Sequence, residues 1–146
     1  GMLCAGDIVV VTEDCKFALT ETTLGIPPAQ IAPFVSQRIG LAKARRIMLT
    51  AARFTGKEAH EMGLADFVAK DADDLKVIEA DIKKGVLKCA PGANAVTKEI
   101  VLATRHLTRK EMIEFAAKGF AERMLSDEGK EGISSFIEKR KPKWSK

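Results

Sequence analysis

The chain has 146 residues, which is one domain's worth of sequence and enough to bury a hydrophobic core. With 46% hydrophobic and 30% charged residues, the composition is typical of a soluble globular protein. No apolar run approaches the ~20 residues that a membrane-spanning helix needs, and no signal-peptide pattern opens the sequence. We therefore expect no membrane partner.

The cysteines and histidines do not form a pattern that indicates a disulfide frame or a metal site. Cys4, Cys15 and Cys89 are odd in number and widely spaced, which favours a reducing, cytoplasmic environment. His60 and His106 lie in charged helical stretches without ligand-like neighbours, so we expect both on the surface.

The net charge is +4, and the excess is concentrated at the C-terminal end. The positive residues there are Lys139, Arg140, Lys141, Lys143 and Lys146. A solvated tail is the simple interpretation. A nucleic-acid-binding helical protein is the weaker alternative, because neither interleaved aromatic residues nor a recognisable binding module accompanies the charge. We therefore predict no nucleic-acid partner.

The chain begins with a mixture of short strands and helices. Residues 3–6 read as the last turn of a helix, and the β-branched run 8–12 predicts a strand covered on both faces, as in a parallel sheet. Residues 16–20 predict a second short strand. Glu21 follows directly, which places one carboxylate at the exit of a strand.

Glu21 stands beside a stiff turn, because Gly25 breaks the chain and Pro27 and Pro28 restrict it. A carboxylate in such a place can act as a general acid or base. From spacing alone, an ordinary surface glutamate is the alternative, and the pattern does not decide between them.

Helical periodicity covers residues 29–52, and Gly40 is expected to divide this stretch into two helices. The run 55–58, Thr-Gly-Lys-Glu, has the spacing of a capping box and predicts a short helix that ends at Gly63. Residues 64–69 then predict a last short strand.

From Asp71 onwards the sequence predicts helices only, over the ranges 71–88, 91–105, 108–125 and 126–140. The composition changes near Lys70, from mixed strand and helix to helix alone. We therefore predict an α/β protein with two parts, 1–70 and 71–146.

Six short motifs follow one another along the chain at characteristic spacings: Asp7-Ile8, Phe17 to Glu21, Leu24-Gly25, Leu49 to Ala51, Glu58 to Leu64, and Glu131 to Pro142. In order and spacing they resemble the second half of the enoyl-CoA hydratase/isomerase (crotonase) superfamily. The resemblance covers nearly the whole chain but only the C-terminal half of the family's fold. It implies that residues 1–70 are the last turn of a strand–strand–helix spiral. Residues 71–146 would be the helical region that forms trimers, often paired into hexamers.

The family stabilises a thioester enolate with two backbone amides, while carboxylates move protons or activate water. Glu21 matches the second of the two hydratase glutamates, so the resemblance implies a general acid/base role for it. The first glutamate's position falls on Gly1, and the segments with the oxyanion amides would lie upstream. Losing one such donor costs ~10²–10³ in rate, so we expect the isolated chain to be inactive.

The resemblance implies further roles. Phe136 and Lys139 match residues that reach a neighbouring subunit's CoA near its adenine and ribose phosphate; core packing and a solvated lysine are the alternatives. The run Pro28 to Val35 resembles hydratases of methylglutaconyl- and isohexenylglutaconyl-type CoA esters, although these prolines could merely set the helix start. No metal or separate cofactor is implied, since CoA is part of the substrate. In a eukaryote the location would be the mitochondrial matrix.

The resemblance leaves three functions open. The first is hydration of a 2-enoyl-CoA thioester. The second is isomerisation or thioester hydrolysis, because one glutamate can serve either reaction. The third is a non-catalytic assembly module that retains the oligomerising helices.

Overall fold

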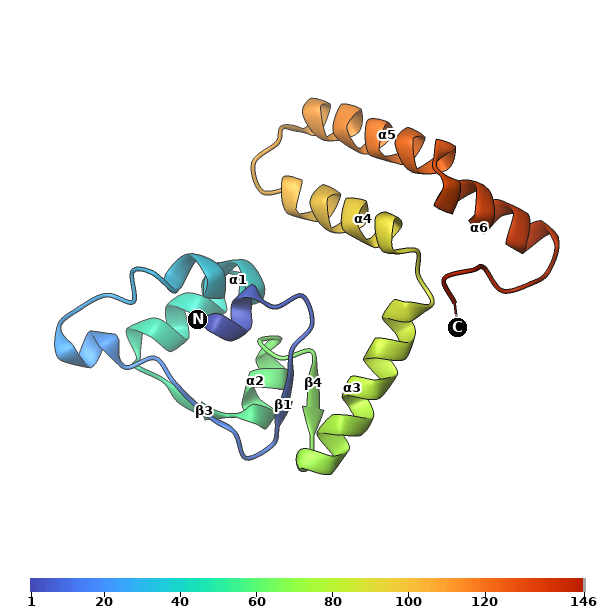
Figure 1. The fold of residues 1–146 in the computed structure, drawn as a ribbon. Coiled ribbons are helices and arrows are strands. Elements are labelled where there is room, and N and C mark those ends of the chain that lie inside the picture. The colour runs from blue at the N-terminus through green and yellow to red at the C-terminus, as the bar shows by residue number, and fades with distance from the viewer. Residues whose placement is uncertain (146) are drawn as a thin grey trace. The chain divides into compact units, whose positions relative to one another are not determined.

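The computed structural model describes residues 1–145. Figure 1 shows the course of the chain through short strands and helices to a C-terminal run of helices. The elements of the described part are η1 (Met2–Ala5), β1 (Val10–Thr12), β2 (Lys16–Ala18), η2 (Glu21–Leu24), α1 (Ala32–Leu49), β3 (Arg53–Thr55), α2 (Gly56–Met62), β4 (Phe67–Ala69), α3 (Ala72–Leu87), α4 (Pro91–Ala103), α5 (Arg109–Leu125) and α6 (Asp127–Ile137). This mixture confirms the predicted α/β class.

The chain forms two compact units, Gly1–Asp81 and Ile82–Lys146, and the division falls within α3. This division follows contacts within the fold, whereas the predicted parts 1–70 and 71–146 were divided where the sequence changes from mixed strand and helix to helix alone, and the resemblance then implied a role for each. Those roles stay a prediction. No helix in the described residues is both long and apolar enough to cross a bilayer.

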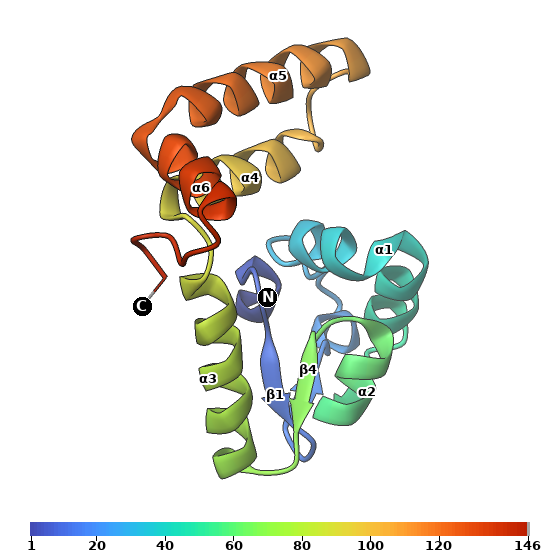
Figure 2. The ribbon, with the colours of Figure 1, turned by 90° about the vertical axis from the view of Figure 1, so that its right-hand side faces the viewer.

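The first unit contains a parallel pair of strands. β1 lies beside β4, with Val11 opposite Val68, and Figure 2 shows the two strands next to α2. Parallel pairing was predicted, but coverage of both faces was not found: Val9 and Val11 are buried, whereas Val10 is half-buried. The reason is the ordinary alternation of side chains along a strand, which turns only every second residue into the core.

The second strand pair is antiparallel and joins β2 to β3. The sequence did not predict β3, because Arg53–Thr55 is a three-residue strand whose last residue also caps α2. Phe17 faces Phe54 in this pair, and the two rings stack with centroids 5.5 Å apart. Phe54 is buried, so this pair forms one wall of the core of the first unit.

Helix α1 supplies half of the buried residues of that core, namely Val35, Ile39, Ala44 and Ile47. The predicted break at Gly40 is confirmed as a kink, where φ is 79° and ψ is 160°. The helix starts at Ala32, three positions later than the periodicity indicated, because the backbone first makes a turn through the two prolines.

Both predicted capping boxes are present. The Thr55 hydroxyl accepts from the Glu58 amide at 3.3 Å, and the Glu58 carboxylate accepts from the Thr55 amide at 2.7 Å. These hydrogen bonds from Thr55 lower the pKa of Glu58. The same exchange between Thr108 and Glu111 begins α5. Each box satisfies amides that the first turn of a helix leaves without partners.

The second unit packs α4 against α5 and α5 against α6. The Ser126 hydroxyl caps α6 by accepting from the Gly129 amide at 3.1 Å. The sequence predicted a last helix to Arg140, but α6 ends at Ile137 because Lys139 adopts a left-handed conformation with φ of 53°. That conformation stops helical propagation and turns the chain back.

Candidate functional site

Strand β2 places Glu21. Leu19 is buried in the core, and its amide donates to the Ala52 carbonyl at 3.2 Å, which extends the pairing of β2 beyond Ala18. Glu21 lies two residues further on and begins the 3₁₀ helix η2. The anchored Leu19 therefore fixes the point at which the Glu21 side chain leaves the strand.

The turn after Glu21 is closed by Gly25, which has a left-handed φ of 75° that glycine adopts without strain. The Ile26 amide donates to the Glu21 carbonyl at 3.3 Å. The Thr22 hydroxyl donates to the Met48 carbonyl at 3.1 Å, which ties η2 to the end of α1. The backbone that carries Glu21 is thus held from both sides.

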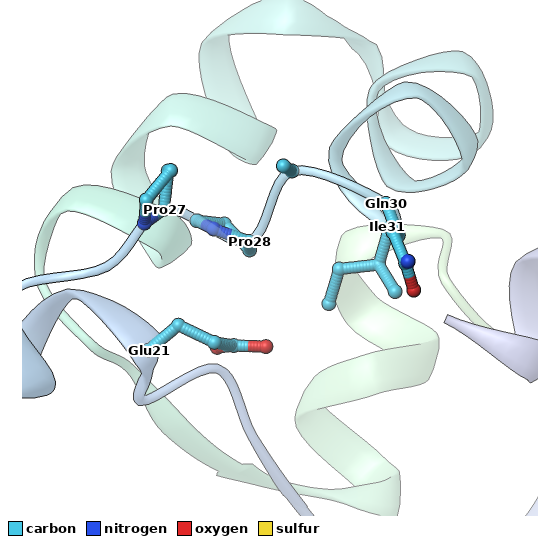
Figure 3. A pocket seen from close by; sticks show the side chains of 6 residues that line it. Glu21, Pro27, Pro28, Gln30 and Ile31 are labelled. Carbon is cyan, nitrogen blue, oxygen red and sulfur yellow. The ribbon is translucent and has the colours of Figure 1, made fainter.

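Glu21 lies in a recess of about 240 Å³. The other residues that line this recess are Pro27, Pro28, Ala29, Gln30 and Ile31. In Figure 3 the Glu21 carboxylate extends towards the side where Gln30 and Ile31 lie, with Pro27 and Pro28 along the adjoining turn. Glu21 is half-buried, and no side chain in the described residues forms a hydrogen bond or ion pair with its carboxylate. A half-buried, uncommitted carboxylate in an apolar recess is suited to proton transfer.

The turn that lines the recess uses most of its own backbone donors. Pro27 and Pro28 have no N–H, the Ala29 amide donates to the Pro27 carbonyl at 2.8 Å, and the Ile31 amide donates to the Pro28 carbonyl at 3.2 Å. An oxyanion hole requires two N–H groups that converge on one oxygen. This turn therefore does not supply the pair of donors that would stabilise a thioester oxyanion.

Gly1, the position that matches the family's first glutamate, lies next to the same recess. A Cβ added at Gly1 would collide with the side chain of Ile31, which lines the recess opposite Glu21. The Cys4 amide donates to the Gly1 carbonyl at 3.0 Å. The structure therefore brings position 1 to the edge of the recess, with glycine there.

Phe136 and Lys139 belong to the second unit. Phe136 is 84% exposed at the end of α6, which contradicts the alternative that it packs in a core. Lys139 is exposed in the left-handed turn that follows, and its amide donates to the Phe136 carbonyl at 3.2 Å. An aromatic face and an ammonium thus lie on one exposed turn, an arrangement that suits a nucleotide phosphate with its base.

Glu131 and Arg140, to which the sequence analysis assigned no role in a site, organise this turn. The Arg140 guanidinium donates to both carboxylate oxygens of Glu131, and its Nη2–Oε2 distance is 3.1 Å. The Lys143 amide donates to the same carboxylate at 3.0 Å. The hydrogen bonds from Arg140, assisted by Lys143, lower the pKa of Glu131 to about 2. The signal in the sequence was the motif itself, Glu131 to Pro142, which contains both partners.

Among the described residues, no group of three or more His, Cys, Asp or Glu side chains is arranged to hold a metal ion. His60 and His106 are both exposed, as predicted, and the His60 Nδ1 lies 3.2 Å from the Ala65 carbonyl oxygen. The candidate site therefore consists of the Glu21 recess and, separately, the exposed turn at Phe136 and Lys139.

Comparison with known proteins shows what the chain is similar to. The family described as enoyl-CoA hydratase/isomerase matches residues 1–146. The chain is 30% identical to a peroxisomal Δ(3,5)-Δ(2,4)-dienoyl-CoA isomerase of Arabidopsis thaliana over 99% of its length. It is 32% identical to the enoyl-CoA hydratase AFT6-1 of Alternaria alternata over 97% of its length.

The fold also matches a solved structure. AtuE of Pseudomonas aeruginosa superposes with a TM-score of 0.97 at 46% identity, covering 100% of this chain and 57% of that one. The chain spans about half the length of the curated relatives it matches, 52% of the isomerase and 47% of the hydratase.

Proposed function

Because the chain belongs to the enoyl-CoA hydratase/isomerase family, we propose that Glu21 is the general acid/base of a hydratase site that adds water to a 2-enoyl-CoA thioester. The observation that carries this proposal is the uncommitted carboxylate of Glu21 in its recess. Hydration adds the oxygen of water to the β-carbon and a proton to the α-carbon. Glu21 would deliver that proton, or would share control of the attacking water.

The negative charge that develops on the thioester oxygen needs two N–H donors. In the turn from Pro27 to Ile31 the Ala29 and Ile31 amides donate within the turn, so the turn does not offer a pair of donors, and we place that pair elsewhere. Removing a single donor of this kind costs ~10²–10³ in rate. We therefore expect residues 1–146 alone to show no hydration, although Glu21 is in position.

The acyl group that we favour is branched and of the methylglutaconyl type. The support is the turn from Pro28 to Val35, whose first residues line the recess beside Glu21. Pro28 and Ile31 offer apolar surface to a branched chain, and the Gln30 amide offers hydrogen bonds to a distal carboxylate. The proposal needs no metal and no separate cofactor, because CoA is part of the substrate.

Isomerisation and thioester hydrolysis remain alternatives at the same site, since one carboxylate can move a proton in each reaction. The similarity to a protein named as a dienoyl-CoA isomerase is the observation that keeps the first alternative open. The product discriminates between the reactions: a 3-hydroxyacyl-CoA, a shifted double bond, or free CoA.

We also propose that the helices of the second unit assemble copies of this chain into a trimer or hexamer. The support is the exposed apolar surface of these helices: Ile113 is 63%, Phe120 67% and Leu125 75% exposed. Exposed apolar side chains in this number are typical of an interaction surface. An assembly role without catalysis is the second candidate function, and it rests on this same observation.

In such an assembly, Phe136 and Lys139 would contact the nucleotide part of a CoA thioester bound by a neighbouring copy. Their common exposed turn supports this assignment, because the ring is free to stack on adenine and the ammonium is free to pair with phosphate.

The decisive experiment follows the loss of enoyl absorbance on mixing a 2-enoyl-CoA with the native-length protein that contains this chain. Glu21→Gln is compared with Glu114→Gln, which removes an exposed carboxylate on α5. We expect Glu21→Gln to lower kcat by about 10²–10⁴ and Glu114→Gln to have no effect. The 146-residue chain is assayed in parallel.

Full activity in Glu21→Gln would refute the acid/base assignment. Turnover by the 146-residue chain that disappears in Glu21→Gln would instead refute the expectation that the isolated chain is inactive. Sedimentation of Phe120→Asp beside the parent chain tests assembly. A shift from trimer to monomer is expected, and an unchanged trimer would show that Phe120 does not lie in the interface.

A further inference from the structure

The segment that follows α6 is fastened to that helix by one carboxylate. Glu131 lies within α6, and its side chain is only 13% exposed. It accepts hydrogen bonds from the Arg140 guanidinium and from the Lys143 amide, and the Lys143 ammonium lies 3.9 Å away. A bidentate guanidinium–carboxylate pair fixes direction as well as distance. Glu131 therefore fixes the path of residues 138–143 against the helix.

The end of the segment is anchored independently. The Trp144 indole donates to the Lys88 carbonyl at 3.2 Å. Its ring lies over Gly132, where an added Cβ would be 3.4 Å from the ring carbon Cη2. In Figure 1 the chain after α6 turns back to its C-terminus, beside the end of α3. Contacts at Glu131 and at Lys88 thus hold both parts of this returning segment.

Lys139 lies at the start of the segment, in a conformation that most residues avoid. Its φ is 53°, in the left-handed region that residues other than glycine rarely adopt. The next amide, that of Arg140, donates to the Ser135 carbonyl at 3.0 Å. The contacts of Arg140 thus offset a conformation that Lys139 would not adopt by itself.

Arg140 and Lys139 differ in whether their charged groups have partners within the protein. The Arg140 guanidinium donates to Glu131, to Glu138 and to the Lys141 carbonyl, so its donors are directed at the protein. The Lys139 ammonium is exposed and has no hydrogen-bond or ion-pair partner among residues 1–145. Of the two adjacent cations, Lys139 is the one free to bind an anion.

We propose that Arg140 is a positioning residue that, by binding Glu131, holds Lys139 in the conformation that presents its ammonium beside Phe136 to the ribose phosphate of CoA. The inference rests on the proposed nucleotide contact and adds the residue that orients it. Arg140 does not touch the ligand; it acts through Lys139.

The test compares binding of CoA and of dephospho-CoA, which lacks the ribose 3′-phosphate, to the native assembled protein. The variants are Arg140→Gln, Lys139→Gln and the double variant, with Arg105→Gln as a control at an exposed arginine of the same unit. We expect the parent to prefer CoA by about tenfold, which corresponds to one charge-assisted contact. Each single variant should lose that preference, and the double variant should lose no more than either single variant.

Binding of dephospho-CoA should be unchanged in every variant, which a general structural defect would not produce. If Arg140→Gln disturbs the helices by circular dichroism, Glu131→Gln is assayed in its place, and Arg140→Lys should recover part of the preference. A parent protein that does not prefer CoA would refute the proposed phosphate contact itself. A preference that Lys139→Gln removes but Arg140→Gln and Glu131→Gln retain would overturn the positioning role alone.

Discussion

The ring of Phe17 stacks on the ring of Phe54, with centroids 5.5 Å apart and planes inclined by 22°. The pair joins β2 to β3. Phe17 lies four residues before Glu21, so the stack helps to hold the strand that leads to this carboxylate. Phe54 is 9% exposed, whereas Phe17 is half-buried. Most of the burial therefore belongs to Phe54.

Replacement of Phe54 by alanine should destabilise the first unit by about 3–5 kcal/mol, because it leaves a cavity and removes the stacked partner of Phe17. Urea unfolding followed by circular dichroism measures the loss. Phe136→Ala, at a ring that is 84% exposed, should cost less than about 1 kcal/mol. Equal losses in both variants would show that the stack contributes no more than an exposed ring.

Arg38 joins three separate segments of the first unit. Its Nε donates to the Leu64 carbonyl at 2.6 Å and its Nη1 to the Gly6 carbonyl at 3.0 Å, while its Nη2 pairs with the Asp66 carboxylate. Asp66 also accepts from the Val9 amide at 2.7 Å. One guanidinium thus connects α1 with the segments that enter β1 and β4.

Arg38→Met should lower the free energy of unfolding by about 2–3 kcal/mol, because it leaves the carbonyl of the buried Leu64, the exposed Gly6 carbonyl and the Asp66 carboxylate without their charged donor. Arg45→Met on the same helix removes an exposed guanidinium and should stay within about 0.5 kcal/mol of the parent. Urea unfolding of both variants measures the difference. A loss of equal size at Arg45 would mean that charge alone, and not the three contacts, stabilises the unit.

The stability of the returning C-terminal segment in acid should depend on the protonation of the Glu131 carboxylate. Its pKa is lowered from 4.5 to about 2 by the hydrogen bonds from Arg140, with Lys143 assisting. A carboxyl group whose pKa is lower in the folded state contributes stability above its unfolded pKa. This contribution is therefore complete above about pH 4.5 and is lost as the pH falls towards 2.

Trp144 is the only tryptophan of the chain, so its fluorescence reports this segment. We expect native fluorescence from pH 7 to about 3 and a change near pH 2, whereas Glu131→Gln should show the altered signal already at pH 7. A midpoint near pH 4.5 in the parent would contradict the assigned pair. The other charged groups that face this pair are Asp127, Lys130, Glu138 and Lys143.

Local signals in the sequence predicted the elements that local chemistry determines. The capping boxes at Thr55 and Thr108 need only four consecutive residues, and both formed as expected. Gly40 and Gly63 were expected to interrupt helices, and both have a positive φ. The short strand β3 was missed because its pairing with β2 depends on residues more than thirty positions away.

The candidate site was predictable only in part for the same reason. The position of Glu21 after a strand could be predicted, since the strand and the turn are adjacent to it. The recess could not, because it depends on how the turn through Pro27 and Ile31 folds back over Glu21. The pairing of Glu131 with Arg140 could not be predicted either, because it requires that α6 end at Ile137 and that the chain then reverse its direction at Lys139.

A substitution at the kink of Gly40 would measure the cost of the backbone conformation without a change in packing, because a Cβ added there would meet no atom within 4 Å. At φ of 79° and ψ of 160° the backbone lies in a region that is essentially restricted to glycine. Gly40→Ala should therefore destabilise the protein by about 1–3 kcal/mol without losing or gaining a contact.

Gly85 in α3 provides the matched control, because a Cβ there also meets nothing within 4 Å but the backbone is helical. Gly85→Ala should stabilise the protein by about 0.5–1 kcal/mol, since alanine loses less conformational entropy in a helix. The two substitutions add the same methyl group to equally open surroundings, so opposite shifts in urea unfolding would isolate the backbone conformation as the cause. Stabilisation by both would mean that α1 straightens through position 40 when the glycine is replaced, and the kink would then be a consequence of glycine's freedom and not of the surrounding fold.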